Sequence, residues 1–187
     1  MAHQLTSPHH RPGGILGYHI GDKVVYPNHG VGIIEDIRRR DIAGAEQEFY
    51  HLRIFSNGTT VMVPVGNSRI VGLRQLFEKK RINQLFTHLR SSEIECYSNW
   101  KGRYKENAEK MRSGHLFDMA DVLKNLVYLS KRKTLSYREK QMYEKAKYLL
   151  VSEVAIVEDQ TESKVQARIE KALETAIIAR SKEKKSA

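Results

Sequence analysis

The segment best suited to chemistry is 98–107, which combines the chain's one tryptophan, Trp100, with the basic side chains of Lys101, Arg103 and Lys105. A flat apolar ring among cations is typical of surfaces that hold nucleic acids, because the cations bind phosphates while the ring stacks on bases or wedges between them. The spacing therefore predicts a DNA contact in which Trp100 wedges against a base step in the minor groove and the basic residues hold the flanking phosphates.

The same segment predicts how the tryptophan is presented. Ser98 or Asn99 can cap a helix with Trp100 in its first turn, where free backbone N–H groups favour phosphate. The alternative is that Trp100 is the first core residue of that helix, because it shares one helical stripe with three others: Tyr104, Ala108 and Met111. Both interpretations stay open on the residues alone.

Signatures of catalysis and of metal binding are thin. The chain has no G-x-S-x-G elbow, no P-loop and no H-E-x-x-H motif. His3, His9 and His10 lie close together but have no carboxylate among them. Cys96 is the single cysteine, so an intrachain disulfide is excluded. We therefore expect no enzyme, no cofactor and no metal site.

Length and hydropathy set the class of protein. The chain has 187 residues, which fits one domain or two small ones, and it contains no apolar run long enough for a transmembrane helix. The opening residues 1–20 have no continuous apolar core and carry prolines and glycines, unlike a secretory signal. We expect a cytoplasmic protein, monomeric and without a membrane contact.

Charge divides the chain in two. The formal net charge is +10, and it lies mostly in the second half: residues 99–147 hold 13 Lys and Arg against 6 Asp and Glu. Such a basic stretch around a tryptophan favours a nucleic-acid surface, although a solvated helical face is the alternative on charge alone.

Periodicity divides the chain at the same place. Up to Leu73 the chain consists of short runs of β-branched and aromatic residues, which predict four or five antiparallel strands. Four of these runs can be bounded: 22–26, 31–38, 48–55 and 59–65. Asn57-Gly58 predicts a tight hairpin turn between the last two runs. Pro64 cannot donate to a ladder, so its strand is expected at an edge, where a partner's strand can pair.

After Leu76 the apolar residues recur every three or four positions, which predicts helices over 78–89, 116–129, 137–157 and 162–180. Ser136 and Glu139 have the spacing of a capping box, and Gly114 has the position of a left-handed helix cap. We therefore expect an α+β protein with a flexible leader (1–20), a small β module (21–76), a helical domain (77–180) and a charged tail (181–187).

Three segments, two in the strand-rich half and one in the helical half, resemble the CarD/CdnL family of bacterial transcription regulators. Residues 21–32 (GDKVVYPNHGVG) resemble the opening of its first domain, and residues 60–64 (TVMVP) resemble a later strand. Residues 99–114, which include Trp100, are similar to the start of its DNA-binding part. The first domain is shared with transcription-repair coupling factors, whereas the tryptophan-bearing half is not.

The resemblance implies a Tudor-like β-barrel that binds the β subunit of RNA polymerase, followed by a helical domain that binds promoter DNA without reading its sequence. By position, Trp100 is the wedge at the upstream fork of the melted promoter, with Arg103 and Lys105 on phosphates. The polymerase-facing residues that it implies are Arg40, Leu52, Met62 and Pro64. Some members have arginine in place of Gly102 or Met62. Nucleoid association follows from the same resemblance.

A second function remains possible on the sequence. In it the chain is an RNA polymerase-binding adaptor that does not bind DNA, its helical domain binds another protein, and Trp100 lies in the core. The residues favour the DNA-binding interpretation because the basic charge surrounds the tryptophan.

Overall fold

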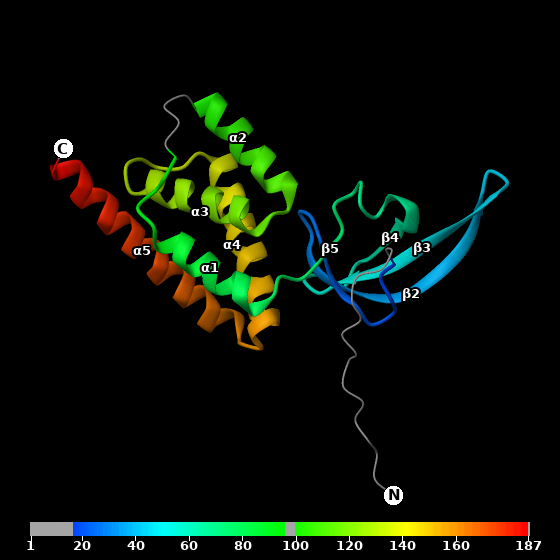
Figure 1. Ribbon diagram of the computed structural model, residues 1–187. Helices are drawn as coiled ribbons and strands as arrows, with labels where there is room; N and C mark the ends of the chain where they lie inside the picture. The colour runs from blue at the N-terminus through cyan, green and yellow to red at the C-terminus, as the bar shows by residue number, and fades with distance from the viewer. Residues whose placement is uncertain (1–16, 96–99, 187) are drawn as a thin grey trace, which may run out of the picture.

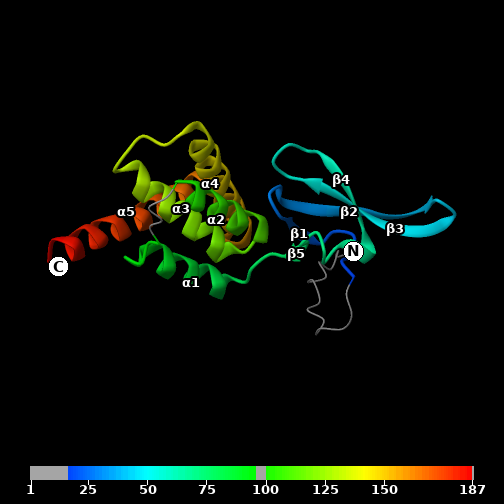
Figure 2. The same cartoon turned by 90° about the horizontal axis from the view of Figure 1, so that it is seen from above.

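The structure is a computed structural model that describes residues 17–95 and 100–186. Within these residues, five β-strands come first and five α-helices follow, and the two groups lie side by side in both views (Figures 1 and 2). The predicted α+β class, with a small Tudor-like β module followed by an all-helical part, is confirmed.

The strands form one antiparallel sheet in the order β4-β3-β2-β1-β5. Their bounds are Lys23–Tyr26 (β1), Gly30–Ile42 (β2), Ala45–Ile54 (β3), Thr60–Pro64 (β4) and Arg74–Gln75 (β5). The predicted hairpin is confirmed, because β3 pairs with β4 across a turn in which Gly58 has φ +67°. The strand that contains Pro64 is an edge strand, as the proline predicts.

Side-chain alternation along β3 builds the core of the β module. Tyr50, Leu52 and Ile54 are buried on one face, as their period of two predicts, whereas Phe55 is exposed. They pack with buried residues from other strands and from the loop before β5: Val24, Ile34, Val63 and Leu73. A bulge after Ile34 shifts the register of β2 against β3.

The β2–β3 hairpin is longer than its apolar pattern predicts. The ladder continues to the pair Ile42 and Ala45, and both turn residues, Ala43 and Gly44, have positive φ. Its outer rungs are exposed, and Arg39 forms an ion pair with Glu48 across them. Backbone hydrogen bonds extend this hairpin without burial, which is why hydropathy could not reveal it.

Tyr18 lies in the predicted leader but packs on the β module. Its backbone N–H donates to the Tyr50 hydroxyl at 3.0 Å, and its own hydroxyl donates to the Leu73 carbonyl at 2.8 Å. The two tyrosine rings meet edge to face. The residues just before Gly21 are thus part of the module, because Tyr18 closes its core.

The helices follow the predicted ranges closely. Their bounds are Lys79–Arg90 (α1), Trp100–Ser113 (α2), Leu116–Ser130 (α3), Tyr137–Glu158 (α4) and Glu162–Ser186 (α5). Together they enclose a core of leucine, isoleucine, valine, alanine, methionine and phenylalanine side chains. The capping box of Ser136 and Glu139 is present, and Gly114 has φ +67° after α2.

The last helix departs from the prediction. α5 continues to Ser186, through most of the segment predicted as a charged tail, and Glu183 accepts a hydrogen bond from Ser92. None of the helices in the described ranges is long and apolar enough to cross a membrane.

Candidate nucleic-acid interface

The helix predicted to carry the tryptophan begins at that residue. α2 starts at Trp100, whose side chain lies outside the described atoms, and Lys101 and Lys105 are exposed on its first two turns. Gly102 is exposed between them, and a Cβ placed there would meet open space. The first turn of α2 and two exposed lysine side chains therefore share one part of the surface.

Arg103 is not a surface cation, contrary to the expected phosphate contact. Its side chain is 8% exposed, and Nη2 donates to Oε1 of Glu139 at 2.9 Å. Positions 101 and 105 face solvent and position 103 faces inward, because residues two apart on a helix point in very different directions. This prediction is corrected: Arg103 belongs to the packing between α2 and α4.

Glu139 joins two structures with one carboxylate. Oε2 accepts from the backbone N–H and hydroxyl of Ser136 in the capping box of α4, while Oε1 accepts from Arg103. Burial alone raises the pKa of Glu139, but the hydrogen bonds from Ser136 and Arg103 outweigh it and hold that pKa below its ordinary value. The start of α2 is thereby attached to the start of α4.

Other basic residues lie close to the start of α2, and the sequence analysis did not single them out. Arg138, in the first turn of α4, lies over the ring of Tyr104 with its Cζ 6.0 Å from the ring centroid. The loop before α4 carries three exposed cations: Lys131, Arg132 and Lys133. The basic run 131–133 just before the capping box of α4 is the local feature of the sequence that could have found them.

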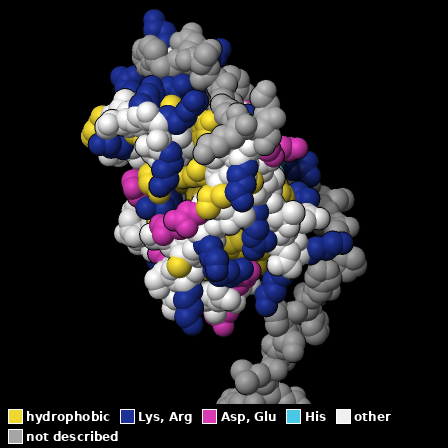
Figure 3. Space-filling view, turned by 90° about the vertical axis from the view of Figure 1, so that its left-hand side faces the viewer, with side chains coloured by type: hydrophobic (Ala, Val, Ile, Leu, Met, Phe, Trp, Pro, Cys, Tyr) yellow, Lys and Arg dark blue, Asp and Glu magenta, His cyan; other side chains and the backbone are white. Residues whose placement is uncertain are grey.

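Figure 3 looks onto the helical end of the molecule, where Lys and Arg side chains spread over the surface with apolar patches between them. Tyr137, the first residue of α4, is 77% exposed and adds an aromatic ring to this surface. We call these exposed cations the basic surface of α2 and α4: Lys101, Lys105, Arg138 and the loop cations 131–133.

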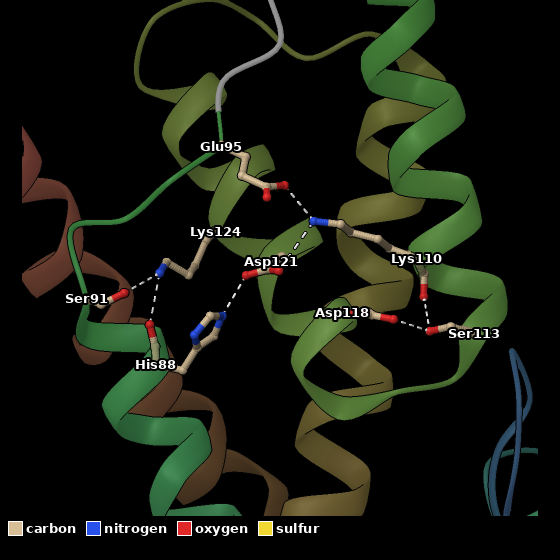
Figure 4. A network of polar contacts seen from close by, with 8 residues as sticks. All are labelled: His88, Ser91, Glu95, Lys110, Ser113, Asp118, Asp121 and Lys124. Atoms are coloured by element: carbon tan, nitrogen blue, oxygen red, sulfur yellow. Dashed lines mark hydrogen bonds and ion pairs between the residues drawn. The ribbon is translucent and has the colours of Figure 1, made fainter.

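The segment that leads into α2 is held by polar contacts with several helices (Figure 4). Lys124 of α3 is buried, and its ammonium donates to the His88 carbonyl at the end of α1 and to the hydroxyl of Ser91, both at 2.9 Å. Burial lowers the pKa of Lys124. This lysine therefore caps α1 and fixes the point at which the chain turns towards α2.

A network of charged side chains connects the end of α1 with α3 and α2 (Figure 4). Asp121 Oδ1 lies 2.6 Å from His88 Nε2, and its Oδ2 lies 3.3 Å from the ammonium of Lys110, which donates to Glu95 at 2.6 Å. Burial alone raises the pKa of Asp121, but His88 and Lys110 outweigh it and hold that pKa below its ordinary value. Glu95, the last described residue before the gap at 96–99, is thus tied to the last turn of α2.

One observation bears on the alternative in which Trp100 is a core residue: the burial of the other side chains on its stripe of α2. On the stripe that Trp100 shares, Tyr104 and Ala108 are half-buried and Met111 is buried among α1, α3 and α4 residues. Burial on this stripe therefore increases from Tyr104 to Met111.

The four residues expected to face the polymerase divide into two groups. Arg40 is exposed on β2, Met62 is 44% exposed on β4, and Pro64 is half-buried at the end of that edge strand. Leu52 is fully buried in the core of the β module, so its expected contact with a partner is corrected. It lies on the inner face of β3 with Tyr50 and Ile54.

The neighbours of Met62 on the outer face come from β3. His51 pairs with Met62 and Phe49 pairs with Pro64, and both β3 side chains are half-buried on the face opposite Leu52. The outer surface of the β module is defined below as Phe49, His51, Met62 and Pro64.

The remaining candidate ligands fall outside the described residues: His3, His9, His10 and Cys96. Over residues 17–95 and 100–186, no group of three His, Cys, Asp or Glu side chains is arranged to hold a metal ion.

Two family models match the chain over consecutive ranges. Residues 18–76 match the CarD-like/TRCF RID domain, and residues 84–170 match the C-terminal domain of CarD. The first range covers all five strands together with Tyr18, and the second covers α2, α3 and α4 completely.

The chain is also similar to a bacterial relative and to two solved structures. The chain is 33% identical over 153 residues to a Bacillus subtilis (strain 168) protein named "Putative transcription factor YdeB", covering 80% of this chain and 98% of that protein. The N-terminal part of CdnL from Myxococcus xanthus is 38% identical over 37% of this chain and 97% of its own, with a TM-score of 0.31. The 72-residue N-terminal domain of Myxococcus xanthus CarD is 36% identical over 36% of this chain and 93% of its own, with a TM-score of 0.29.

Proposed function

Because the chain belongs to the CarD/CdnL family of transcription factors, we propose that it binds RNA polymerase through its β module and promoter DNA through its helical domain. In this proposal Trp100 enters the minor groove at the upstream fork of the melted promoter and slows closure of the bubble. The observation that carries it is the start of α2 at Trp100, with Lys101 and Lys105 exposed beside it.

The DNA contact needs no base recognition. Lysine side chains and first-turn amides bind phosphate oxygens, and these are the same at every base pair. Arg138 and the loop cations 131–133 widen the surface that can meet the backbone on either side of the tryptophan. An apolar ring inserted between base steps selects DNA that is already unstacked or bent, as it is at a fork.

Arg103 supports the contact without touching DNA. Its buried ion pair with Glu139 keeps the first turn of α2 against α4, so the basic residues of both helices share one surface. Loss of this ion pair would release the turn that carries Trp100.

The polymerase contact is proposed for the outer surface of the β module. Met62 and Pro64 lie on the edge strand β4, whose free side can pair with a strand of the β subunit. Arg40 on the β2–β3 hairpin adds a cation beyond them. Leu52 contributes by filling the core beneath this surface.

The two contacts act together. Each is weak alone, but tethering to polymerase raises the effective concentration of the helical domain at the promoter. Only binding that favours open over closed DNA shifts the equilibrium between them. If stacking of Trp100 contributes about 1–3 kcal/mol to the open complex only, its lifetime increases by about 5- to 150-fold.

A second candidate function is an RNA polymerase-binding adaptor whose helical domain binds another protein rather than DNA. The observation that favours it is the burial of Met111 on the stripe of α2 that Trp100 shares. In this account Trp100 is a core residue and the basic surface is solvated.

Tryptophan fluorescence separates the two, because Trp100 is the single tryptophan and reports on itself. The free protein is titrated with forked DNA and with fully paired DNA of the same sequence. We expect an emission maximum typical of exposed indole and stronger quenching by the fork. A buried indole that neither DNA quenches would support the adaptor.

A further inference from the structure

The β module and the helical domain meet at one arginine, Arg74 of the two-residue strand β5. Its guanidinium donates five hydrogen bonds: Nε and Nη2 to the Gly114 carbonyl at 3.0 and 2.8 Å, Nη1 to the Gln75 carbonyl at 3.1 Å, and Nη1 and Nη2 to Glu153 at 2.7 and 2.9 Å. These bonds involve every nitrogen of the side chain, and two of the acceptors lie in the helical domain.

Glu153 is the counterpart of Arg74 in the middle of α4. Its side chain is 1% exposed, both carboxylate oxygens accept from Arg74, and Oε1 also accepts from the backbone N–H of Phe77 at 3.3 Å. The guanidinium lies 4.2 Å from the centre of the Phe77 ring. A bidentate ion pair of this kind fixes the direction of the guanidinium as well as its distance from the carboxylate.

Backbone contacts next to the arginine are close. A Cβ on Gly114 would lie 3.0 Å from Cγ of Pro27, the residue after β1, and Gly114 itself has φ +67°. Gly114 joins α2 to α3, so the carbonyl that Arg74 binds belongs to the turn at the end of α2. Substitution of this glycine would both strain the turn and push the two parts of the molecule apart.

Apolar contacts complete the junction. A small cleft between the two parts is lined from both sides by Val25, Pro27, Gly30, Gly114, Leu149 and Glu153. In Figures 1 and 2, β5 lies on the side of the sheet nearest the helices, at the start of the segment that leads into α1. The connection between the two parts is therefore packed and hydrogen-bonded.

We propose that Arg74 and Glu153 form a positioning clamp that holds the β module and the helical domain at one angle. The clamp rests on the proposed function in one respect: it delivers α2 to the promoter fork when the β module is bound to polymerase. A tethered contact gains from its tether only if the geometry lets both sites engage at once. A fixed angle also leaves less conformational freedom to lose on binding.

The angle can be measured in the free protein from residual dipolar couplings of backbone amides. In the wild-type chain, couplings from residues 21–76 and 77–180 should fit one alignment tensor. Arg74→Met should make the two sets fit different tensors while each set still fits its own domain. Arg74→Lys keeps the positive charge but cannot form the bidentate pair. Its two sets of couplings should therefore depart from a common tensor less than those of Arg74→Met.

Two further variants keep the test decisive. The double variant Arg74→Met/Glu153→Met removes both buried charges, so it folds even if the single variant does not, and it should also separate the tensors. Arg168→Met is the matched control: Arg168 pairs with Glu158 and its Cζ lies 4.4 Å from the Phe86 ring centre, all within the helical domain. This control should leave one common tensor.

Open-complex lifetime provides the functional readout. The double variant should bind polymerase with unchanged affinity, yet its extension of the lifetime should fall by about 5-fold or more. One common tensor in the double variant, or separated tensors with an unchanged lifetime, would overturn the clamp. If the wild-type chain does not extend the lifetime, the proposed function fails, and the tensors alone then decide whether the clamp exists.

Discussion

Arg103 in the first turn of α2 and Glu139 in the first turn of α4 form a buried ion pair, with 2.9 Å between Nη2 and Oε1. The pair joins the turn that carries Trp100 to the capping box of a second helix. It holds the backbone of the turn at which α2 begins. Its consequences are measurable as stability and as function.

Replacement of Arg103 by Met should destabilise the helical domain. The variant leaves the Glu139 carboxylate buried without its cation, and loss of one partner of a buried pair costs about 3–5 kcal/mol. Chemical denaturation followed by circular dichroism measures this loss. Lys105→Met is the matched control on the exposed face of α2, and its free energy of unfolding should stay within about 0.5 kcal/mol of the wild type. Equal losses in the two variants would show that Arg103 is not held as described.

The exposed lysines of α2 should act through phosphate. The double variant Lys101→Ala/Lys105→Ala should bind DNA more weakly and reduce the slope of log K against log salt concentration by about 2, since each phosphate contact contributes about 0.9. Titrations at several salt concentrations measure the slope. The pair Lys79→Ala/Lys80→Ala, in the first turn of α1, is the control and should leave it unchanged. An unaltered slope in the α2 variant would place the DNA elsewhere.

Met62 and Leu52 should separate binding from folding. Met62→Ala should weaken binding to RNA polymerase with little change in stability, because its side chain is 44% exposed. Leu52→Ala should lower the free energy of unfolding of the β module by about 2–5 kcal/mol, because the side chain is fully buried. Pull-down of purified polymerase and thermal unfolding measure the two effects. The reverse pattern would mean that the two faces of the module have been assigned the wrong way round.

Acid should weaken the network around Asp121. A carboxyl group whose pKa is held below its ordinary value in the folded state stabilises the protein above that value, and the contribution is lost as the pH falls through the folded pKa. Asp121→Asn lacks this contribution, so its stability deficit relative to the wild type should shrink as the pH falls below about 4. Denaturation curves from pH 7 to pH 3 test this. A deficit that stays constant over that range would contradict the pKa direction.

Much of the fold followed from local pattern. The hairpin turn at Asn57-Gly58 joins β3 to β4 as expected, and the helix ranges agree with the structure to within a few residues until α5. The β2–β3 hairpin was too short in the prediction because its outer rungs carry polar side chains, where backbone pairing leaves no hydropathy signal. Position 103 was misplaced for a related reason: charge in the sequence does not reveal whether an arginine meets solvent or a buried carboxylate.

Contacts between distant segments were beyond the sequence. Arg103 meets Glu139 across 36 positions of the chain, and Arg74 meets Glu153 across 79. Neither pair has a local signature, since each residue taken alone has the composition of a solvated surface. Leu52 shows a different limit, because the resemblance implied a partner contact for a side chain that the structure buries in the core.

The most direct test of the account is the lifetime of an open complex on a ribosomal RNA promoter, formed by cognate RNA polymerase holoenzyme. It is measured without factor, with the wild-type chain, with Trp100→Ala and with Trp100→Phe, which keeps an aromatic ring. We expect the wild type to extend the lifetime by about 5- to 150-fold, Trp100→Ala to lose most of the extension while still binding polymerase, and Trp100→Phe to retain part of it. An extension that survives in Trp100→Ala, or no extension by a wild-type chain that binds polymerase, would contradict it.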